Sequence, residues 1–453
     1  MLYSSSGKTT VTHPSRSPEN EPLVRSEPTY NRWILGLFFL FSLYMVLPLV
    51  DIPFWGLSLS APIFFFIAMA CLFKPPRPWF NTYRRWITLA VLIWMGIFFS
   101  VIANGLLSGG VNLDNGGIIS FIRYAYWLLA FVITAYFASQ KKVLKTVTSI
   151  LGWGAMILAL LRWGEVLIYH NIGAWAGTHL LTENNYGFNF SVFSPFLLVL
   201  MIQQRGWKRV LAMAGIILLW GAAAINGSRG SWVSIAGGLG LCLVMLAWSR
   251  SKKLPGLLVM LSLMGGIILV AGIALPEVAA KVMSRFNTFQ LLAEDKSYVT
   301  RQVLIQKGLR LFEQSPILGV GASRFTQSYV PLDIPDVLST STTRLNTITA
   351  HNSYLDFLAE NGLVGAVPYA VLLGILAVQG LLSAIRGLRR GQYIAFAVFL
   401  AFIQMSVHMW AIASITNTAN WFIYGLTVAA YIVDKKEVET EIEPSDHRIS
   451  IIP

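Results

Sequence analysis

The chain has 453 residues, of which 55% are hydrophobic and only 12% are charged, about half the charged share of a soluble protein. The mean hydropathy of +0.62 excludes a soluble fold and is typical of a membrane protein. A formal net charge of +13 raises the question of a nucleic-acid partner. The two cysteines, Cys71 and Cys242, lie inside apolar segments, which argues against a disulfide framework or a metal site.

Residues 1–32 are rich in Ser, Thr, Pro and charge, a composition that predicts a disordered tail. After this tail we predict an all-α polytopic membrane protein of about twelve transmembrane helices, because apolar segments of near-spanning length follow one another. The predicted spans are residues 33–50, 55–73, 86–103, 118–139, 146–168, 186–202, 210–225, 231–248, 254–275, 363–383, 393–413 and 415–433.

Positive charges divide the short loops into two groups. The loops on one side carry sixteen Lys and Arg residues, whereas the opposite short loops carry a single arginine, Arg229. The sixteen are Lys74, Arg77, Arg84, Arg85, Lys141, Lys142, Lys145, Arg205, Lys208, Arg209, Arg250, Lys252, Lys253, Arg386, Arg389 and Arg390. Because Lys and Arg accumulate in cytoplasmic loops, both termini are predicted to be cytoplasmic. The basic excess therefore indicates topology and contact with anionic membrane lipids, and no nucleic-acid partner is expected.

A long connection between spans nine and ten is predicted to form a folded helical cap in the periplasm. It carries eight basic and eight acidic residues, so it is no polybasic patch. Thr300 is expected to cap an amphipathic helix that Ser315 and Pro316 end. The predicted division of the chain is a cytoplasmic tail (1–32), spans one to nine (33–275), the periplasmic loop (276–362), spans ten to twelve (363–433) and a cytoplasmic tail (434–453).

His351 opens the most informative stretch of the chain. A short helical pattern follows it, and Asn361-Gly362 is expected to stop that helix. A segment of about twenty apolar residues comes next, so His351 should lie one short helix away from the membrane surface. At a helix start the macrodipole favours the neutral, proton-accepting imidazole. His351 is therefore a candidate general base.

Three motifs in this order resemble the O-antigen ligase family. They are His-Asn-x-Tyr-Leu-x4-Glu-x-Gly-x2-Gly at 351–365, Pro-Ile-Leu-Gly-Val-Gly at 316–321 and Asn-Gly-Ser-Arg-Gly at 226–230. The resemblance extends from about Thr182 onward and implies an integral membrane enzyme that moves a lipid-diphosphate-linked glycan to an acceptor. It further implies inverting transfer without metal or ATP, at the periplasmic face of a bacterial inner membrane. The implied donor is an undecaprenyl-diphosphate-linked O-antigen, and the implied acceptor is the lipid A core in lipopolysaccharide biosynthesis.

Arginines are the candidate ligands for the diphosphate. Arg229 lies in a tight turn whose amides and guanidinium can cradle phosphate, although an arginine that reaches the interface is the structural alternative. Arg229 and Arg301 match the family's essential arginines, so the resemblance assigns them to catalysis with His351. Arg123 and Arg162 lie near the outer ends of spans four and five, where charge is costly and usually functional. We expect both to support diphosphate binding.

Four further residues are candidates for substrate binding: Asn185, Asn352, Tyr354 and Glu360. Asn352 would hold the loop or the acceptor, and Tyr354 would stack on a sugar or belong to the interfacial aromatic belt. Glu360 would orient a ligand or stabilise a helix end, while Asn185, in a Glu-Asn-Asn element that also resembles the family, would line the site. The chain has no Asp-x-Asp, His-Glu-x-x-His or phosphate-loop motif. We therefore expect no cofactor and no metal, with arginines stabilising the leaving group.

Other functions stay open at this point. O-antigen polymerases and protein O-oligosaccharide ligases share parts of the motif set. A polymerase accepts lipid-linked glycan at both of its sites, whereas a ligase needs the lipid A core. A lipid-linked glycan flippase or transporter is a more distant alternative, because broken helices and charges near the bilayer middle are not plain in the sequence.

Overall fold

The computed structural model describes residues 32–47, 60–73, 79–107, 115–169, 181–274, 276–287, 295–335, 338, 345, 348–412 and 414–442. The predicted N-terminal tail up to residue 31, and the C-terminal tail from residue 443, lie outside these ranges. Within them the chain forms helices and no strand, which confirms the predicted all-α fold.

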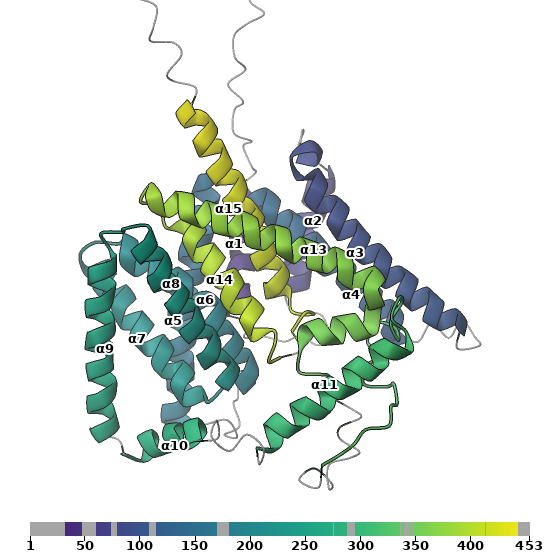
Figure 1. Ribbon diagram of the computed structural model, residues 1–453. Helices are drawn as coiled ribbons and strands as arrows, with labels where there is room; N and C mark the ends of the chain where they lie inside the picture. Colours follow the sequence, from purple (N-terminus) through teal and green to yellow (C-terminus); the bar gives the residue numbers. More distant parts are fainter. Residues whose placement is uncertain are drawn as a thin grey trace, which may run out of the picture. The chain divides into compact units, whose positions relative to one another are not determined.

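A helix overlaps each of the twelve predicted spans (Figure 1). They are α1 (Arg32–Val46), α2 (Ser60–Phe73), α3 (Trp79–Leu107), α4 (Asn115–Phe137), α5 (Lys141–Tyr169), α6 (Glu183–Gln203), α7 (Trp207–Asn226), α8 (Arg229–Trp248), α9 (Leu254–Ala274), α13 (Ser353–Arg389), α14 (Ile394–His408) and α15 (Thr418–Ile442). Within the described ranges, seven are long and apolar enough to cross a membrane: α3 to α8 and α13. The chain is therefore a multi-pass membrane protein, and the full count of twelve spans stays a prediction.

Helix α15 continues past the predicted end of the last span, through residues assigned to the C-terminal tail. Asp434 is 4% exposed and accepts hydrogen bonds from Arg386 on α13 and from Arg390 at the C-cap of that helix. Glu437, one turn later, pairs with Lys141 at 2.6 Å. These ion pairs explain why the helix extends to Ile442 instead of ending with its apolar residues.

The connection between α9 and α13 contains two further helices, α10 (Pro276–Asn287) and α11 (Lys296–Gln314). The amphipathic helix predicted here is α11, and it ends at Ser315 as expected. The predicted cap at Thr300 is wrong, because the side chain of Asp295 caps the helix by accepting a hydrogen bond from the Tyr298 N–H at 2.9 Å. The N-cap therefore lies five residues earlier than predicted, and Thr300 lies inside the helix.

Helix α11 packs its apolar face on the first segment of α13. Its Gly308 allows close contact, since a Cβ there would lie 2.6 Å from Cγ of Leu355. The contact is part of a buried apolar cluster made of Leu304, Leu311, Phe325, Val330, Ala350, Leu355 and Ala359. The connection thus has a hydrophobic core of its own, while its place on a periplasmic membrane surface stays a prediction.

Helix α13 breaks at Gly362, as the Asn-Gly pair predicted, and then continues as a second helical segment (Figure 1). The break leaves backbone N–H groups without helical partners. Leu363 and Val364 donate theirs to the carbonyls of Pro316 and Ile317, at 2.9 and 3.1 Å. A Cβ on Gly319 would lie 2.3 Å from the carbonyl oxygen of Glu360. The Pro-Ile-Leu-Gly-Val-Gly motif therefore fills the break in α13.

The orientation predicted from loop charges can be checked at two exposed positions. Tyr329 is 75% exposed in the connection between α9 and α13, and Lys252 is exposed in a basic loop. With Cys71 and Cys242 replaced by Ser, Tyr329→Cys should react with an impermeant maleimide in intact cells, because its loop is predicted to be periplasmic. Lys252→Cys should react only after the membrane is permeabilised. The reverse pattern would overturn the orientation.

Candidate functional site

The ends of four helices, α6, α7, α8 and α14, meet close to the turn that contains Arg229. The side-chain amide of Asn226 donates to the carbonyl of Glu183 at 2.8 Å, which joins the end of α7 to the start of α6. A Cβ on Gly187 would lie 2.7 Å from Ser228, and one on Gly230 would lie 3.5 Å from the ring of His408. Glycines at these two positions therefore let α6, α8 and α14 approach closely.

Arg229 is the first residue of α8, and its guanidinium holds a carboxylate. The turn is built by Gly227, in the left-handed conformation at φ 76°, and by Ser228 at the helix N-cap position. Arg229 donates two hydrogen bonds to the two oxygens of Asp295, at 2.9 and 3.2 Å. This planar two-point grip is the geometry with which arginine also binds phosphate. It ties α8 to the start of α11.

The carboxylate of Asp295 is held in its charged form. Burial alone raises its pKa, but the hydrogen bonds from Arg229 and from the Tyr298 N–H outweigh burial and hold the pKa below its ordinary value. Asp295 therefore neutralises Arg229 while it caps α11.

Arg301 lies on α11 and brings a second guanidinium to the same place. Burial lowers its pKa, the neighbouring charge of Arg229 lowers it further, and Asp295 and Glu183 act in the opposite direction. An arginine remains charged after such a shift. Because Arg229 and Arg301 repel each other, an anion that lies between them would be bound favourably.

His351 lies just before α13, with its backbone in the left-handed region at φ 50°. The predicted helix start is displaced by one residue, since Asn352 is the N-cap and Ser353 begins the helix. Burial lowers the pKa of the half-buried imidazole, and the positive charge of Arg301 lowers it further. Both causes favour the neutral, proton-accepting ring. The structure thus brings His351, Arg301 and Arg229 into one electrostatic cluster.

Three other predicted site residues hold the fold of this motif. Asn352 accepts hydrogen bonds from the N–H groups of Tyr354 and Leu355, both at 3.1 Å. The hydroxyl of Tyr354 donates to the carbonyl of Ser406 at 2.9 Å. The carboxylate of Glu360 accepts from the Phe325 N–H at 3.2 Å. For each residue these contacts favour the structural alternative over direct sugar binding.

Arg162 and Glu165 share a helix face, as their spacing predicts. Their side chains are 0% and 4% exposed and form an ion pair at 3.1 Å on α5. The guanidinium of Arg162 also lies 5.6 Å from the ring centre of Tyr186 on α6. A buried arginine with a carboxylate partner and an aromatic neighbour is well suited to joining two helices. This arrangement favours a structural role over direct contact with a diphosphate.

Arg123 and Asn185 lie on α4 and α6. The residue next to Arg123, Tyr124, packs its ring 5.8 Å from that of Phe357, which places this part of α4 beside the first segment of α13. Asn185 lies in the first turn of α6, where its backbone N–H donates to the hydroxyl of Thr182 at 3.3 Å. Its side chain is exposed and is a candidate for lining the site.

Two residues beside this cluster were not predicted as site residues. Asp295 is recognisable only through its N-cap spacing to Tyr298, and the competing cap at Thr300 obscured it. His408 ends α14, is 2% exposed and lies 3.4 Å through Nδ1 from the hydroxyl of Ser191. The signal for His408 was an ionisable residue inside an apolar segment.

Fold and site together define a multi-pass helical membrane protein with an arginine- and histidine-containing cluster at one end of its helices. The family model for O-antigen ligases matches residues 214–370, a range that includes Arg229, Arg301 and His351. This match confirms the resemblance inferred from the motifs. Members of this family are membrane enzymes of the glycosyltransferase type and include ligases and polymerases. No curated protein matches the chain.

The contact between Arg229 and Asp295 gives a first prediction. Asp295→Asn keeps a side chain that caps α11 well but removes the charge that competes with an anion for Arg229. The purified variant should bind inorganic pyrophosphate a few-fold more tightly than the parent, a gain on the order of 1 kcal/mol. The matched control is Asp333→Asn, because Asp333 pairs with the exposed Arg310 at 3.0 Å. Unchanged or weaker binding of Asp295→Asn would show that Arg229 is not an anion site.

Proposed function

We propose that this protein is an O-antigen ligase of a bacterial inner membrane. It moves O-antigen polysaccharide from undecaprenyl diphosphate to the lipid A core oligosaccharide at the periplasmic face, as a step of lipopolysaccharide biosynthesis. The observation that carries the proposal is the cluster of Arg229, Arg301 and His351, built from three separate segments of the family-matched range. The connection between α9 and α13 would be the periplasmic cap over this site.

In this proposal the two arginines bind the diphosphate of the donor. Arg229 exchanges the carboxylate of Asp295 for phosphate oxygens, since both anions accept two parallel hydrogen bonds from a guanidinium. Arg301 supplies the second positive charge. As the glycosidic bond breaks, negative charge grows on the oxygen of the leaving diphosphate, and guanidinium groups already in place stabilise it. No metal and no ATP take part in this scheme.

His351 would activate the acceptor. Its neutral imidazole takes the proton of a sugar hydroxyl on the lipid A core, and the hydroxyl oxygen attacks the anomeric carbon of the donor. A new carbon–oxygen bond forms on the face opposite the breaking one, so the configuration inverts and undecaprenyl diphosphate leaves. Arg123 and Asn185 are the candidates for contacts with the substrates, and Arg162, Asn352, Tyr354 and Glu360 would hold the surrounding fold.

The alternative enzymes differ from this proposal in their acceptor. A polymerase would attack with the sugar of a second lipid-linked glycan, and a protein O-oligosaccharide ligase with a protein hydroxyl. A flippase or transporter would use broken helices near the bilayer middle. The break in α13 lies only about three turns from the helix start, and its N–H groups bond to the carbonyls of Pro316 and Ile317. That arrangement favours an enzyme over a transporter.

Reconstitution tests the proposed function. Proteoliposomes that contain the purified protein and undecaprenyl-diphosphate-linked O-antigen are supplied separately with lipid A core, with a second lipid-linked glycan and with an acceptor protein. Transfer to lipid A core is the expected result. Chain extension on the lipid-linked glycan, without transfer to the core, would make the protein a polymerase.

The role of the arginines predicts that lysine cannot replace them. Arg229→Lys and Arg301→Lys keep the charge but lose the planar fork that binds two phosphate oxygens. Each should lower the transfer rate about tenfold or more, a barrier increase of about 1.4 kcal/mol. Arg310→Lys, at an exposed site on α11, is the matched control. Transfer by the parent protein should persist in excess EDTA, and its loss with recovery on adding Mg²⁺ or Mn²⁺ would overturn the arginine mechanism.

The role of His351 predicts both a mutant phenotype and a pH profile. His351→Ala should abolish transfer but leave binding of the lipid-linked donor intact, because the residue acts in the chemical step. The active form is neutral and the pKa is lowered from 6.5. Transfer should therefore keep more than half of its maximal rate at pH 6.5 and reach half of that rate only at a lower pH. A decline already centred above pH 6.5, or near-normal transfer by His351→Ala, would contradict the assignment.

A further inference from the structure

A cavity of about 380 Å³ lies at the opposite end of the helices from the arginine–histidine cluster. It is lined by Ile202, Gln203, Gln204, Arg205, Gly206, Arg209, Lys253, Gly391 and Tyr393. Helix α6 begins at Glu183, beside the cluster, and ends at Gln203 after 21 residues, a length of about 30 Å. Helix α14 connects the same two places, from Tyr393 at the cavity to His408 at the cluster. The cavity is thus a separate site, outside the proposed reaction.

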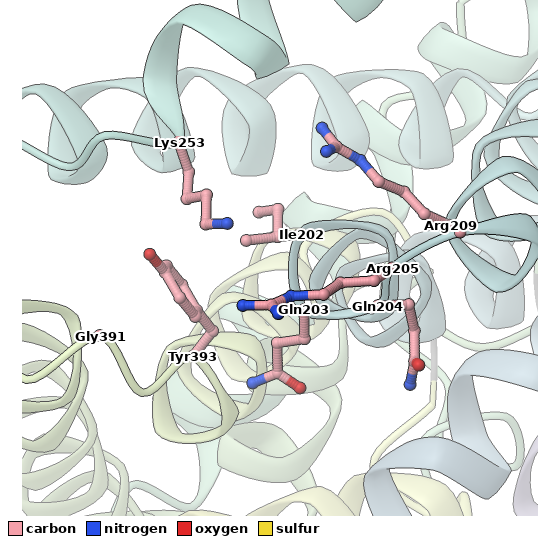
Figure 2. Close-up of a pocket in the computed structure, with 9 residues that line it drawn as sticks. Ile202, Gln203, Gln204, Arg205, Arg209, Lys253, Gly391 and Tyr393 are labelled. Atoms are coloured by element: carbon pink, nitrogen blue, oxygen red, sulfur yellow. The ribbon is translucent and has the colours of Figure 1, made fainter.

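Three cations surround this cavity without an acidic residue among its nine lining residues. In Figure 2 the guanidinium of Arg205, the amine of Lys253 and the ring of Tyr393 extend toward the same space, and Arg209 lies beside it. Arg205 comes from the turn after α6, Arg209 from the start of α7 and Lys253 from the loop before α9. Like charges brought together in this way repel one another unless an anion lies between them.

An adjoining cavity at the same end of the helices differs from the first one, because acidic residues lie among its lining residues. That cavity, about 340 Å³, is lined by Lys141 and Lys145 but also by Asp434 and Glu437. Lys141 pairs with Glu437 at 2.6 Å, and Arg390 pairs with Asp434. One of its two lining lysines, Lys141, therefore has a carboxylate partner from the chain itself, and the lining includes two carboxylates. The first cavity has the same kind of cations and lacks the carboxylates.

Helix starts add to the positive potential of the first cavity. Helix α7 follows Gly206 and helix α14 follows Tyr393, and neither has a hydrogen bond from a capping side chain. Their first N–H groups and the positive ends of their dipoles lie at the lining residues. Glycines at φ 58° and 72°, Gly206 and Gly391, make the turns that place these starts there. Such amides supplement the three cations in binding a phosphate group.

Exposed tryptophans place the cavity near a membrane–water boundary. Trp207, the first residue of α7, is 70% exposed, and Trp248, the last residue of α8, is 69% exposed. Aromatic side chains of this kind concentrate at the level of the lipid headgroups. We infer that this cavity binds a phosphate group, presented by the headgroup of an anionic phospholipid of the cytoplasmic leaflet. Basic pockets between membrane helices on that side are suited to such headgroups.

Ligand binding to the purified protein in detergent tests this inference. Dioctanoyl phosphatidylglycerol, zwitterionic dioctanoyl phosphatidylcholine and inorganic phosphate are titrated separately, and bound molecules are counted by native mass spectrometry. The charge-removing variant is Arg205→Gln/Arg209→Gln/Lys253→Gln, and the matched control is Lys141→Gln/Lys145→Gln in the adjoining cavity. The parent and the control should bind phosphatidylglycerol, and the triple variant should bind it at least about tenfold more weakly.

The three ligands distinguish a site for a phospholipid headgroup from a site for free phosphate. Phosphatidylglycerol binding that inorganic phosphate does not displace supports a lipid site, whereas equally tight binding of inorganic phosphate identifies a site for free phosphate. Equal binding of phosphatidylcholine, or unchanged binding by the triple variant, would overturn the inference. Lys253→Gln alone, which changes one exposed side chain, should show a smaller loss and serves if the triple variant does not fold. Transfer activity is not part of the readout, so the result is independent of the proposed function.

Discussion

The break in α13 is the feature on which the arrangement of the candidate site depends. A helix that stops and restarts at Gly362 must satisfy its freed N–H groups, and the carbonyls of Pro316 and Ile317 do so. This contact fixes the end of α11 beside the first segment of α13. His351 and Arg301 lie on these two elements, one residue before α13's N-cap and one turn into α11. A purely structural motif therefore sets the spacing of the residues proposed for chemistry.

Two ion pairs, Arg229 with Asp295 and Arg162 with Glu165, differ in how readily they could open to an incoming anion. Arg229 is neutralised by Asp295, and Arg162 by Glu165, so neither is left as an isolated charge in a partly dry place. The two pairs differ in their surroundings. The Arg162–Glu165 pair lies within one helix and is closed off from solvent, whereas the Arg229–Asp295 pair joins two elements and is 12% and 10% exposed. An incoming anion can exchange with Asp295 far more easily than with Glu165.

Local patterns in the sequence predicted the features that depend on neighbouring residues. The helix break at Asn361-Gly362, the turn at Arg229 and the shared face of Arg162 and Glu165 follow from spacings of a few residues. The start of α11 was missed because Asp295 and Thr300 are both good N-cap residues, and only tertiary contact with Arg229 decides between them. The partner of Glu360, the Phe325 N–H, lies 35 residues away and has no local signal. The assignment of Arg301 to the site rested on the family resemblance, whereas Arg123 and Arg162 were proposed from their charge near the ends of apolar segments.

The two ends of the helices differ in how their basic residues are balanced by acidic residues. This difference adds a structural observation to the topology predicted from the loop charges. At the end near His351 the connection between α9 and α13 carries as many acidic as basic residues, and Arg229 is paired with Asp295 there. At the other end many loops are basic, and most of the charge around Asp434 and Glu437 is paired within the chain. Arg205, Arg209 and Lys253 instead converge on one cavity whose nine lining residues include no acidic residue. Basic residues that only determine the orientation of the helices in the membrane have no need to lie close together. Because these three surround one cavity, their arrangement argues for a bound anion.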